Sequence, residues 1–311
     1  MQRTSTLSVP THKHKLRSYQ KSLLLMMIPG LLFFIIYKYY PMYGILIAFK
    51  SFRIKKGIWG SPWANPIMKN FNTFFKSPYC VQVLTNTISI SIAKLVFSMM
   101  ACVVLAVLLS EVRSQKFKRF VQTVTYLPHF LSWVIIYGIL YAIVSESSGL
   151  INVMLRAAGK HTIPILTNPK LFQPLLVITD IWKNTGWGAI VYLAAIAGID
   201  PGLYEAAEID GATRMQRMWH ITLACIRPTI VMLLILKLGS VLDAGFDQIY
   251  TLYNTQVYEV ADIIDTWVYR IGLEQLNYST ATAVGLFKSI IGTILVITVN
   301  SIARRWDEAL W

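Results

Sequence analysis

The most informative stretch of the sequence is residues 199–213, IDPGLYEAAEIDGAT. Asp200 followed by Pro201 is typical of a helix start, with Asp as N-cap and Pro at the first helical position, where its φ is already set. The Asp-Gly pair at 210–211 is a stop signal, because glycine adopts the left-handed conformation at little cost. A second short helix is expected from 212 to about 219. The stretch therefore predicts two short helices joined by a sharp glycine corner.

Apolar segments long enough to cross a bilayer lie on both sides of this stretch. The 311-residue chain is 55% hydrophobic and 14% charged, whereas soluble domains carry about 25% charged residues. A span needs about 20 apolar helical residues. We predict an all-α polytopic integral membrane protein with a single domain, 22–303, in which residues 200–220 connect helices 4 and 5. Its six spans are expected at 22–49, 84–110, 120–144, 174–198, 221–242 and 281–303.

The net charge of +14 fits basic residues that flank membrane spans. Six spans place the tails, 1–21 and 304–311, on one side of the membrane. Basic residues are in slight excess on that side, and the dense cluster at 113–119 resists translocation, so both termini are predicted to be cytoplasmic and the location is the cell membrane. Nucleic-acid binding would need a water-facing basic patch, and the sequence has no soluble domain large enough to carry one.

The sequence carries no recognisable catalytic motif. It lacks the pattern G-x-x-x-x-G-K-[ST] of a phosphate-binding loop and the patterns H-E-x-x-H and C-x-x-C of metal sites. The three cysteines are scattered, and no set of His, Ser, Cys or carboxylate residues converges near one membrane face. We therefore predict a protein that is not an enzyme, with no catalytic residue, no metal site and no cofactor bound by this chain.

The composition of residues 200–220 suits docking on another protein. Glu205 and Glu208 lie in early turns, where carboxylates interact favourably with the helix dipole, and Ala206 and Ala207 leave a small, close-packing surface. The alternative is an amphipathic helix at the lipid interface. That alternative fits poorly, because anionic lipid would repel the acidic first half of the segment. The segment is expected to dock into a protein groove.

These residues carry a resemblance to a known family. Glu205-Ala206-Ala207 and Asp210-Gly211-Ala212, followed by Ile221, Leu223 and Pro228, resemble the EAA motif of permease subunits in binding-protein-dependent, type I ABC importers. The usual Leu-Pro pair reads Leu223-Ala224 here, which should soften the kink entering span five. Flanking stretches resemble the carbohydrate branch of LplB/YteP-like oligosaccharide permeases. They are 126–130, 180–188, 247–254, 257–262 and 283–289, within a resemblance that runs from about 23 to 311.

The resemblance implies one half of an importer that works by alternating access. A second homologous permease, usually a different one, completes the pathway, and two ATP-binding cassette ATPase subunits carry ATP and Mg. An extracellular solute-binding lipoprotein delivers the carbohydrate. The residues implied to form the coupling helix that meets the ATPase are Glu205, Ala206, Ala207, Asp210, Gly211 and Ala212.

Charged and aromatic residues within the spans are candidates for the substrate pathway. Asp180, Lys183 and Asn184 share one face of span four, because they are spaced i, i+3 and i+4. Charged groups in a membrane are costly and point to function. Two interpretations remain open: a sugar contact site, or an internal Asp180–Lys183 pair that fixes helix packing. The complete set of candidates is Asp180, Trp182, Lys183, Asn184, Trp187 and His129.

Lysines near the spans bear on the substrate. Lys94, Lys237 and Lys288 can extend to an interface, and Lys94 and Lys288 lie deep enough to contact a partner subunit instead. If several of these lysines face the pathway, an acidic oligosaccharide, for example a pectin-derived uronate, is favoured. The alternative function is that of an ion-coupled secondary transporter or channel subunit. The sequence shows no repeat of hydropathy between its halves, which disfavours that alternative.

Overall fold

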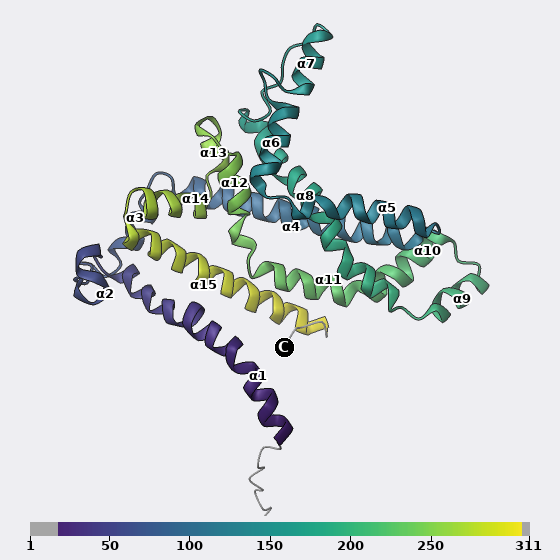
Figure 1. Cartoon of the computed structure of the whole chain (residues 1–311), viewed down its shortest axis with the longest axis horizontal. Coiled ribbons are helices and arrows are strands. Elements are labelled where there is room, and N and C mark those ends of the chain that lie inside the picture. Colours follow the sequence, from purple (N-terminus) through teal and green to yellow (C-terminus); the bar gives the residue numbers. More distant parts are fainter. Residues whose placement is uncertain (1–17, 307–311) are drawn as a thin grey trace, which may run out of the picture. The chain divides into compact units, whose positions relative to one another are not determined.

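The computed structural model describes residues 18–306, which form helices joined by short connections (Figure 1). The described residues divide into two compact units, with the boundary between residues 46 and 47. In the first, α1 (Ser18–Phe34) continues through η1 (Ile35–Tyr39) into η2 (Tyr40–Phe49), whose last three residues belong to the second unit. This helix covers the first predicted span, and its apolar side chains are largely exposed, as lipid contact would require. Most of the predicted tail 1–21 and the end of the tail 304–311 lie outside the described residues.

The centre of the second unit is the pair α4 (Cys80–Glu111) and α8 (Pro169–Ala197), with α5 (Gln115–Tyr126) packed on α8. Two glycines of α8 allow these helices to approach closely. A Cβ atom on Gly186 would lie 2.1 Å from the carbonyl oxygen of Thr125, and one on Gly188 would lie 2.5 Å from the Sγ of Cys102. Residues with side chains at these two positions would force the three helices apart.

The predicted third span, 120–144, is divided in two. The pair formed by residues 115–130 and α6 (Trp133–Val144) is bent by 107°. Pro128 lies in the short turn η4 (Leu127–Phe130), and a proline has no backbone N–H with which to continue the α-helical hydrogen bonding. Ser132 then adopts an extended backbone and accepts a hydrogen bond from the backbone N–H of Ile135, which starts α6 in its new direction.

The fifth apolar helix differs from its predicted bounds of 221–242. It begins with α10 (Arg214–Arg217) and passes through the π turn η5 (Met218–Thr222) into α11 (Leu223–Leu238), giving one apolar helix from Arg214 to Leu238. It ends four residues before the predicted end. Ala244 and Gly245 follow in left-handed conformations (φ 50° and 81°), so the chain turns there into the next segment.

Short helices form the segment between α11 and the last long helix, α15 (Tyr278–Ala303). Buried apolar side chains from this segment, among them Ile249 and Ile263, pack in one cluster with Ile90 of α4 and Phe172 of α8. The elements of this segment are η6 (Val241–Asp243), α12 (Phe246–Leu252), η7 (Thr255–Val257), α13 (Tyr258–Ala261), α14 (Ile264–Tyr269) and η8 (Arg270–Glu274).

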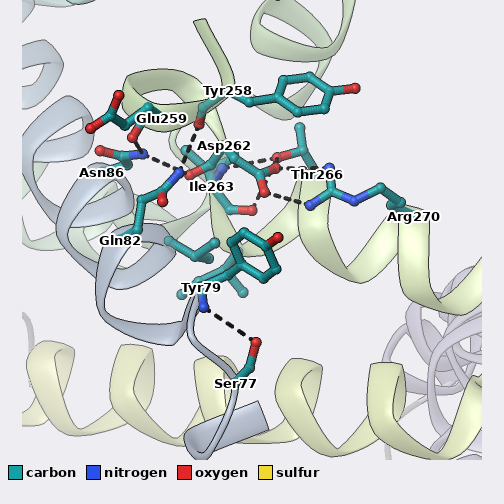
Figure 2. A network of polar contacts seen from close by, with 12 residues as sticks. Ser77, Tyr79, Gln82, Asn86, Tyr258, Glu259, Asp262, Ile263, Thr266 and Arg270 are labelled. Atoms are coloured by element: carbon teal, nitrogen blue, oxygen red, sulfur yellow. Dashed lines mark hydrogen bonds and ion pairs between the residues drawn. The ribbon is translucent and has the colours of Figure 1, made fainter. Parts of the chain in front are cut away.

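Polar contacts also tie this segment to α4. Figure 2 shows the side chains of Gln82 and Asn86 directed at the backbone of residues 258–263. Gln82 donates to the carbonyl oxygen of Tyr258 (3.0 Å), and Asn86 donates to those of Glu259 (3.0 Å) and Asp262 (3.1 Å). These three hydrogen bonds connect side chains of α4 to the backbone of the segment and so restrict its movement relative to α4.

The membrane fold class is confirmed. Residues 22–49, 80–111, 214–238 and 278–303 are each long and apolar enough to cross a membrane, and two bent pairs, 115–144 and 169–209, raise the number to six. The second pair joins α8 to α9 (Pro201–Ile209) with a bend of 69°. The remaining helices are η3 (Ile54–Lys56), α2 (Gly57–Gly60), α3 (Lys69–Phe75), α7 (Leu150–Ala157) and η9 (Arg304–Trp306).

Candidate functional site

The glycine corner after α9 has the predicted geometry. Asp200 is the N-cap, and its side chain accepts a hydrogen bond from the N–H of Gly202 (2.9 Å). Gly211 has φ 76°. The N–H of Gly211 donates to the carbonyl of Glu208 (3.1 Å), and the N–H of Ala212 donates to that of Ala207 (2.8 Å). This is the Schellman arrangement, which satisfies the last carbonyls of a helix and fixes the exit direction of the chain.

The second short helix begins later than predicted, at Arg214 instead of Ala212. Thr213 has an extended backbone and is the N-cap: its backbone N–H donates to the side chain of Gln216 (2.7 Å), whose own N–H donates to the Thr213 hydroxyl (3.4 Å). This reciprocal capping box makes Thr213 the boundary residue. The corner is therefore stabilised on both sides of Gly211.

Two side-chain contacts connect α9 to the helix that follows. Arg217 donates to Glu208 across the corner (2.8 Å). The hydroxyl oxygens of Tyr204 and Thr222 lie 2.9 Å apart, which joins α9 to the π turn η5. These two contacts connect α9 to the start of the apolar helix that contains α11.

The opposite face of α9 is exposed. Glu205 and Ala206 are exposed, and Ile209 is 87% exposed. Leu203 is also nearly half exposed. Apolar side chains that project from a helix fixed in this way are typical of a surface that a partner protein covers. Ile209 and Leu203 were absent from the predicted coupling residues, although an apolar residue beside the Glu-Ala-Ala triplet is a signal that a sequence can show.

In α8, polar side chains form a continuous chain of contacts. Ser98 of α4 donates to Asp180 (2.7 Å), and Asn184 donates to the other oxygen of the same carboxylate (3.0 Å). The Nδ1 atom of His129 lies 3.2 Å from the Oδ1 of Asn184, and its ring stacks on Trp187 with centroids 4.9 Å apart. The structure therefore brings Asp180, Asn184, His129 and Trp187 together.

Lys183 and Trp182 have other surroundings. The buried ammonium group of Lys183 donates to the carbonyl oxygens of His129 (2.9 Å) and Leu131, and it lies 5.5 Å from the ring centre of Trp133. Within residues 18–306 it makes no ion pair with Asp180. Lys183 thus holds the bend between α5 and α6 in place. Trp182 is nearly half exposed and is not part of this chain of contacts in the described residues.

A second charged cluster surrounds Lys288 on α15. Its ammonium group lies 2.7 Å from both carboxylate oxygens of Asp265 on α14 and 2.6 Å from one oxygen of Asp243 on η6. Burial raises the pKa of the Asp265 carboxyl, an effect that the hydrogen bond and charge of Lys288 oppose. The sequence placed Lys288 among the lysines of interest but did not reveal its partners, which lie 23 and 45 residues away along the chain.

The segment that supplies Asp265 is itself fixed by an ion pair. Arg270 donates to both oxygens of Asp262 (3.2 and 2.5 Å), and Thr266 donates to the same carboxylate (2.7 Å), as Figure 2 shows. Burial alone would lower the pKa of the Arg270 guanidinium. The hydrogen bond and negative charge of Asp262 act in the opposite direction, and the net result is a raised pKa. Bidentate pairing of this kind fixes the relative geometry of the two side chains as well as stabilising their contact. The pair therefore helps to hold α14, the helix that carries Asp265, in place.

The sequence matches known proteins over most of its length. Residues 98–310 match the family of binding-protein-dependent transport system inner membrane components. Protein LplB of Bacillus subtilis (strain 168) is 46% identical over 288 residues, which cover 93% of this chain and 90% of LplB. The polygalacturonan/rhamnogalacturonan transport system permease protein YteP of the same organism is 45% identical over 289 residues, covering 93% and 89% of the two chains.

A similar structure has also been solved. It is a chain of a bacterial ABC transporter involved in the import of the acidic polysaccharide alginate, with a TM-score of 0.85 and 39% sequence identity over 92% of this chain and 96% of that chain. A chain of a bacterial alginate ABC transporter in complex with alginate pentasaccharide-bound periplasmic protein matches with the same TM-score and 38% identity over 94% and 96% of the two chains. The chain described here therefore belongs to the family of binding-protein-dependent transport system inner membrane components, the non-catalytic permeases of ABC transporters.

Proposed function

We propose that this chain is one permease subunit of an ATP-driven importer of acidic oligosaccharides, with uronate-containing fragments such as those of pectin as the substrate class. The relatives with a named substrate that are 38–45% identical support this assignment, since polygalacturonan, rhamnogalacturonan and alginate are all acidic. The relatives named for lactose and arabinooligosaccharides, which are neutral, are only 26–30% identical. The single structural observation that carries the transport role is α9, an exposed helix locked to α11 by the Gly211 corner.

The proposed assembly contains a second, homologous permease and two ATPase subunits, which hold ATP and Mg. An extracellular solute-binding lipoprotein delivers the oligosaccharide, and both termini of this chain face the cytoplasm. A solved relative in complex with a substrate-bound periplasmic protein supports the delivery step. The exposed face of α9, with Glu205, Ala206 and Ile209, supports the ATPase contact.

In this proposal ATP binding moves α9, and the movement reaches the membrane through two contacts, Arg217–Glu208 and Tyr204–Thr222. The π turn η5 begins α11, so a shift of α9 reorients the fifth span directly. The permeases then change from inward-open to outward-open and receive the oligosaccharide. Polar groups along α8, from Asp180 to His129, are the proposed contacts for sugar hydroxyls, and Trp187 offers an aromatic face.

Glu205→Lys tests the proposed contact with the ATPase. The substitution reverses the charge on an exposed side chain, so the chain should insert and fold normally. The amount of copurified ATPase should fall by roughly ten-fold or more, as expected for loss of a charged interface contact. The measurement is the ratio of ATPase to permease after affinity purification. Glu146→Lys, which reverses an exposed carboxylate in the connection after α6, is the matched control. Equal ATPase recovery with both variants would show that α9 is not the docking helix.

A further inference from the structure

A chamber of about 700 Å³ lies between the end of α11, α14 and α15. This volume falls within the range of small-molecule sites, roughly 300–1,000 Å³. Lys288, Asp243 and Asp265 line it, together with the hydroxyl-bearing Ser289 and Thr293. The wall therefore combines a cation, two carboxylates and two hydroxyl groups.

Glycines make room in the same wall. Gly239 of the connection after α11 and Gly285 and Gly292 of α15 all line the chamber, and a Cβ atom on Gly285 would meet no heavy atom within 4 Å. None of the three has a left-handed backbone, since their φ angles are all negative. The absence of side chains here leaves space beside Lys288 for a ring-sized group.

A second pocket of about 460 Å³ adjoins the chamber, because Asp265 lines both. Its other lining residues include three aromatic side chains, Phe246, Tyr269 and Tyr278. Flat aromatic faces suit the apolar faces of sugar rings, whereas a lysine suits a carboxylate. The two adjoining pockets therefore offer both features of a uronic acid.

We propose that Lys288 binds a carboxylate of the transported oligosaccharide in this chamber, where the uronate takes the place of Asp243 and Asp265 remains bound. This inference rests on the proposed function and assigns its substrate class to one site. The ligand class is a uronic acid within an oligosaccharide. Exchange of one carboxylate for another leaves unchanged the number of carboxylates in contact with Lys288.

Differences in exposure support the choice of Asp243 as the group that leaves. The side chain of Asp243 is 58% exposed, whereas those of Asp265 and Lys288 are 23% and 15% exposed. An ion pair with so exposed a partner contributes little net stability. Asp265, in contrast, contacts Lys288 through both oxygens and projects from the fixed helix α14. The uronate thus competes with the weaker of the two partners.

The test measures binding of fluorescent trigalacturonate, by anisotropy, to the complete importer in lipid nanodiscs. A trisaccharide with its carboxylates reduced to alcohols is the neutral comparison. Loss of a charge-assisted hydrogen bond predicts that Lys288→Met raises the Kd for trigalacturonate roughly ten-fold or more and leaves the Kd for the reduced sugar within about two-fold. Lys288→Arg retains most of the affinity, and Lys116→Met, which removes an exposed lysine of α5 outside the chamber, changes neither Kd.

Asp243→Asn provides a test that does not depend on damage to the site. Removal of the competing carboxylate should tighten binding of trigalacturonate by roughly two- to five-fold, the effect of one exposed ion pair, with no change for the reduced sugar. Equal losses for both sugars in Lys288→Met, or weaker acidic-sugar binding in Asp243→Asn, would overturn the assignment of the site. Uptake by the wild-type importer is a separate measurement, and failure to import trigalacturonate at all would overturn the proposed function and this inference with it.

Discussion

At the scale of single residues, Gly211 is the position on which the corner between α9 and α10 depends. Its φ of 76° favours glycine, and no heavy atom lies within 4 Å of where a Cβ would be, so the cost of a side chain there comes from the backbone alone. Gly211→Ala should raise the energy of the corner by about 1–2 kcal/mol, which shifts its population roughly five- to thirty-fold. We expect ATP-driven uptake to fall as the population of the intact corner falls. The measurement is the transport rate in proteoliposomes at equal protein incorporation.

Gly198→Ala is the matched control for this prediction. Gly198 ends α8 with φ −87°, a conformation that alanine adopts freely, and the nearest atom to an added Cβ is 3.5 Å away. The transport rate of the Gly198→Ala variant should equal that of the wild type. If the two alanine variants transported equally well, the corner would have no part in coupling.

Residue-scale predictions from the sequence succeeded where the causes are local. The helix-start role of Asp200 and the helix-end role of Gly211 follow from their neighbours within a turn, and both of these local roles are confirmed. The surroundings of Lys183 were not predictable in the same way. It donates to carbonyl groups more than 50 residues away along the chain, and only the folded arrangement of α5, α6 and α8 brings them within reach.

At the scale of elements, the close packing of α8 against α5 is the feature most easily disrupted by a single substitution. Gly186→Ala would place a Cβ 2.1 Å from the carbonyl oxygen of Thr125, and a backbone atom cannot move aside as a side chain can. Such overpacking costs about 1–3 kcal/mol. We expect the apparent Tm of the detergent-solubilised protein to fall by several degrees.

The control for that change is Gly138→Ala in α6, where an added Cβ meets nothing within 4 Å. Alanine has the higher helix propensity, so this variant should unfold at the wild-type temperature or slightly above it. A similar loss of Tm in both variants would mean that glycine content, and not helix contact, sets the stability.

The sequence predicted that the long helices exist, but it did not predict the residues at which they begin and end or the angles at which they bend. Apolar length indicated the long helices α4 and α15 within a few residues. The sequence also showed Pro128, but a proline alone does not set the 107° bend between residues 115–130 and α6. That angle depends on the Ser132 cap and on the carbonyl groups held by Lys183. The early start of the fifth helix at Arg214 depends similarly on the Thr213 capping box.

At the scale of the whole molecule, composition predicted the membrane fold and the EAA resemblance predicted the family, and both are confirmed. The Lys288 chamber was not predictable, since its wall combines residues 239–243, 265 and 285–297 from separate elements. The sequence after α11, residues 243–280, contains six acidic residues, but only the fold shows that two of them, Asp243 and Asp265, contact Lys288. The charge of the chain therefore indicates a membrane protein, and the pairing of Lys288 in the fold is the basis on which we propose a binding place for an acidic substrate.

The most direct test of the central claim is uptake of radiolabelled trigalacturonate into proteoliposomes that contain the complete importer and its solute-binding protein. ATP is supplied on the side of the ATPase subunits, and ionophores collapse all ion gradients. We predict uptake that requires ATP, persists without ion gradients and is much slower for the carboxyl-reduced trisaccharide. Uptake that proceeds without ATP and stops when the gradients are collapsed, or that is equally fast for both sugars, would contradict this prediction.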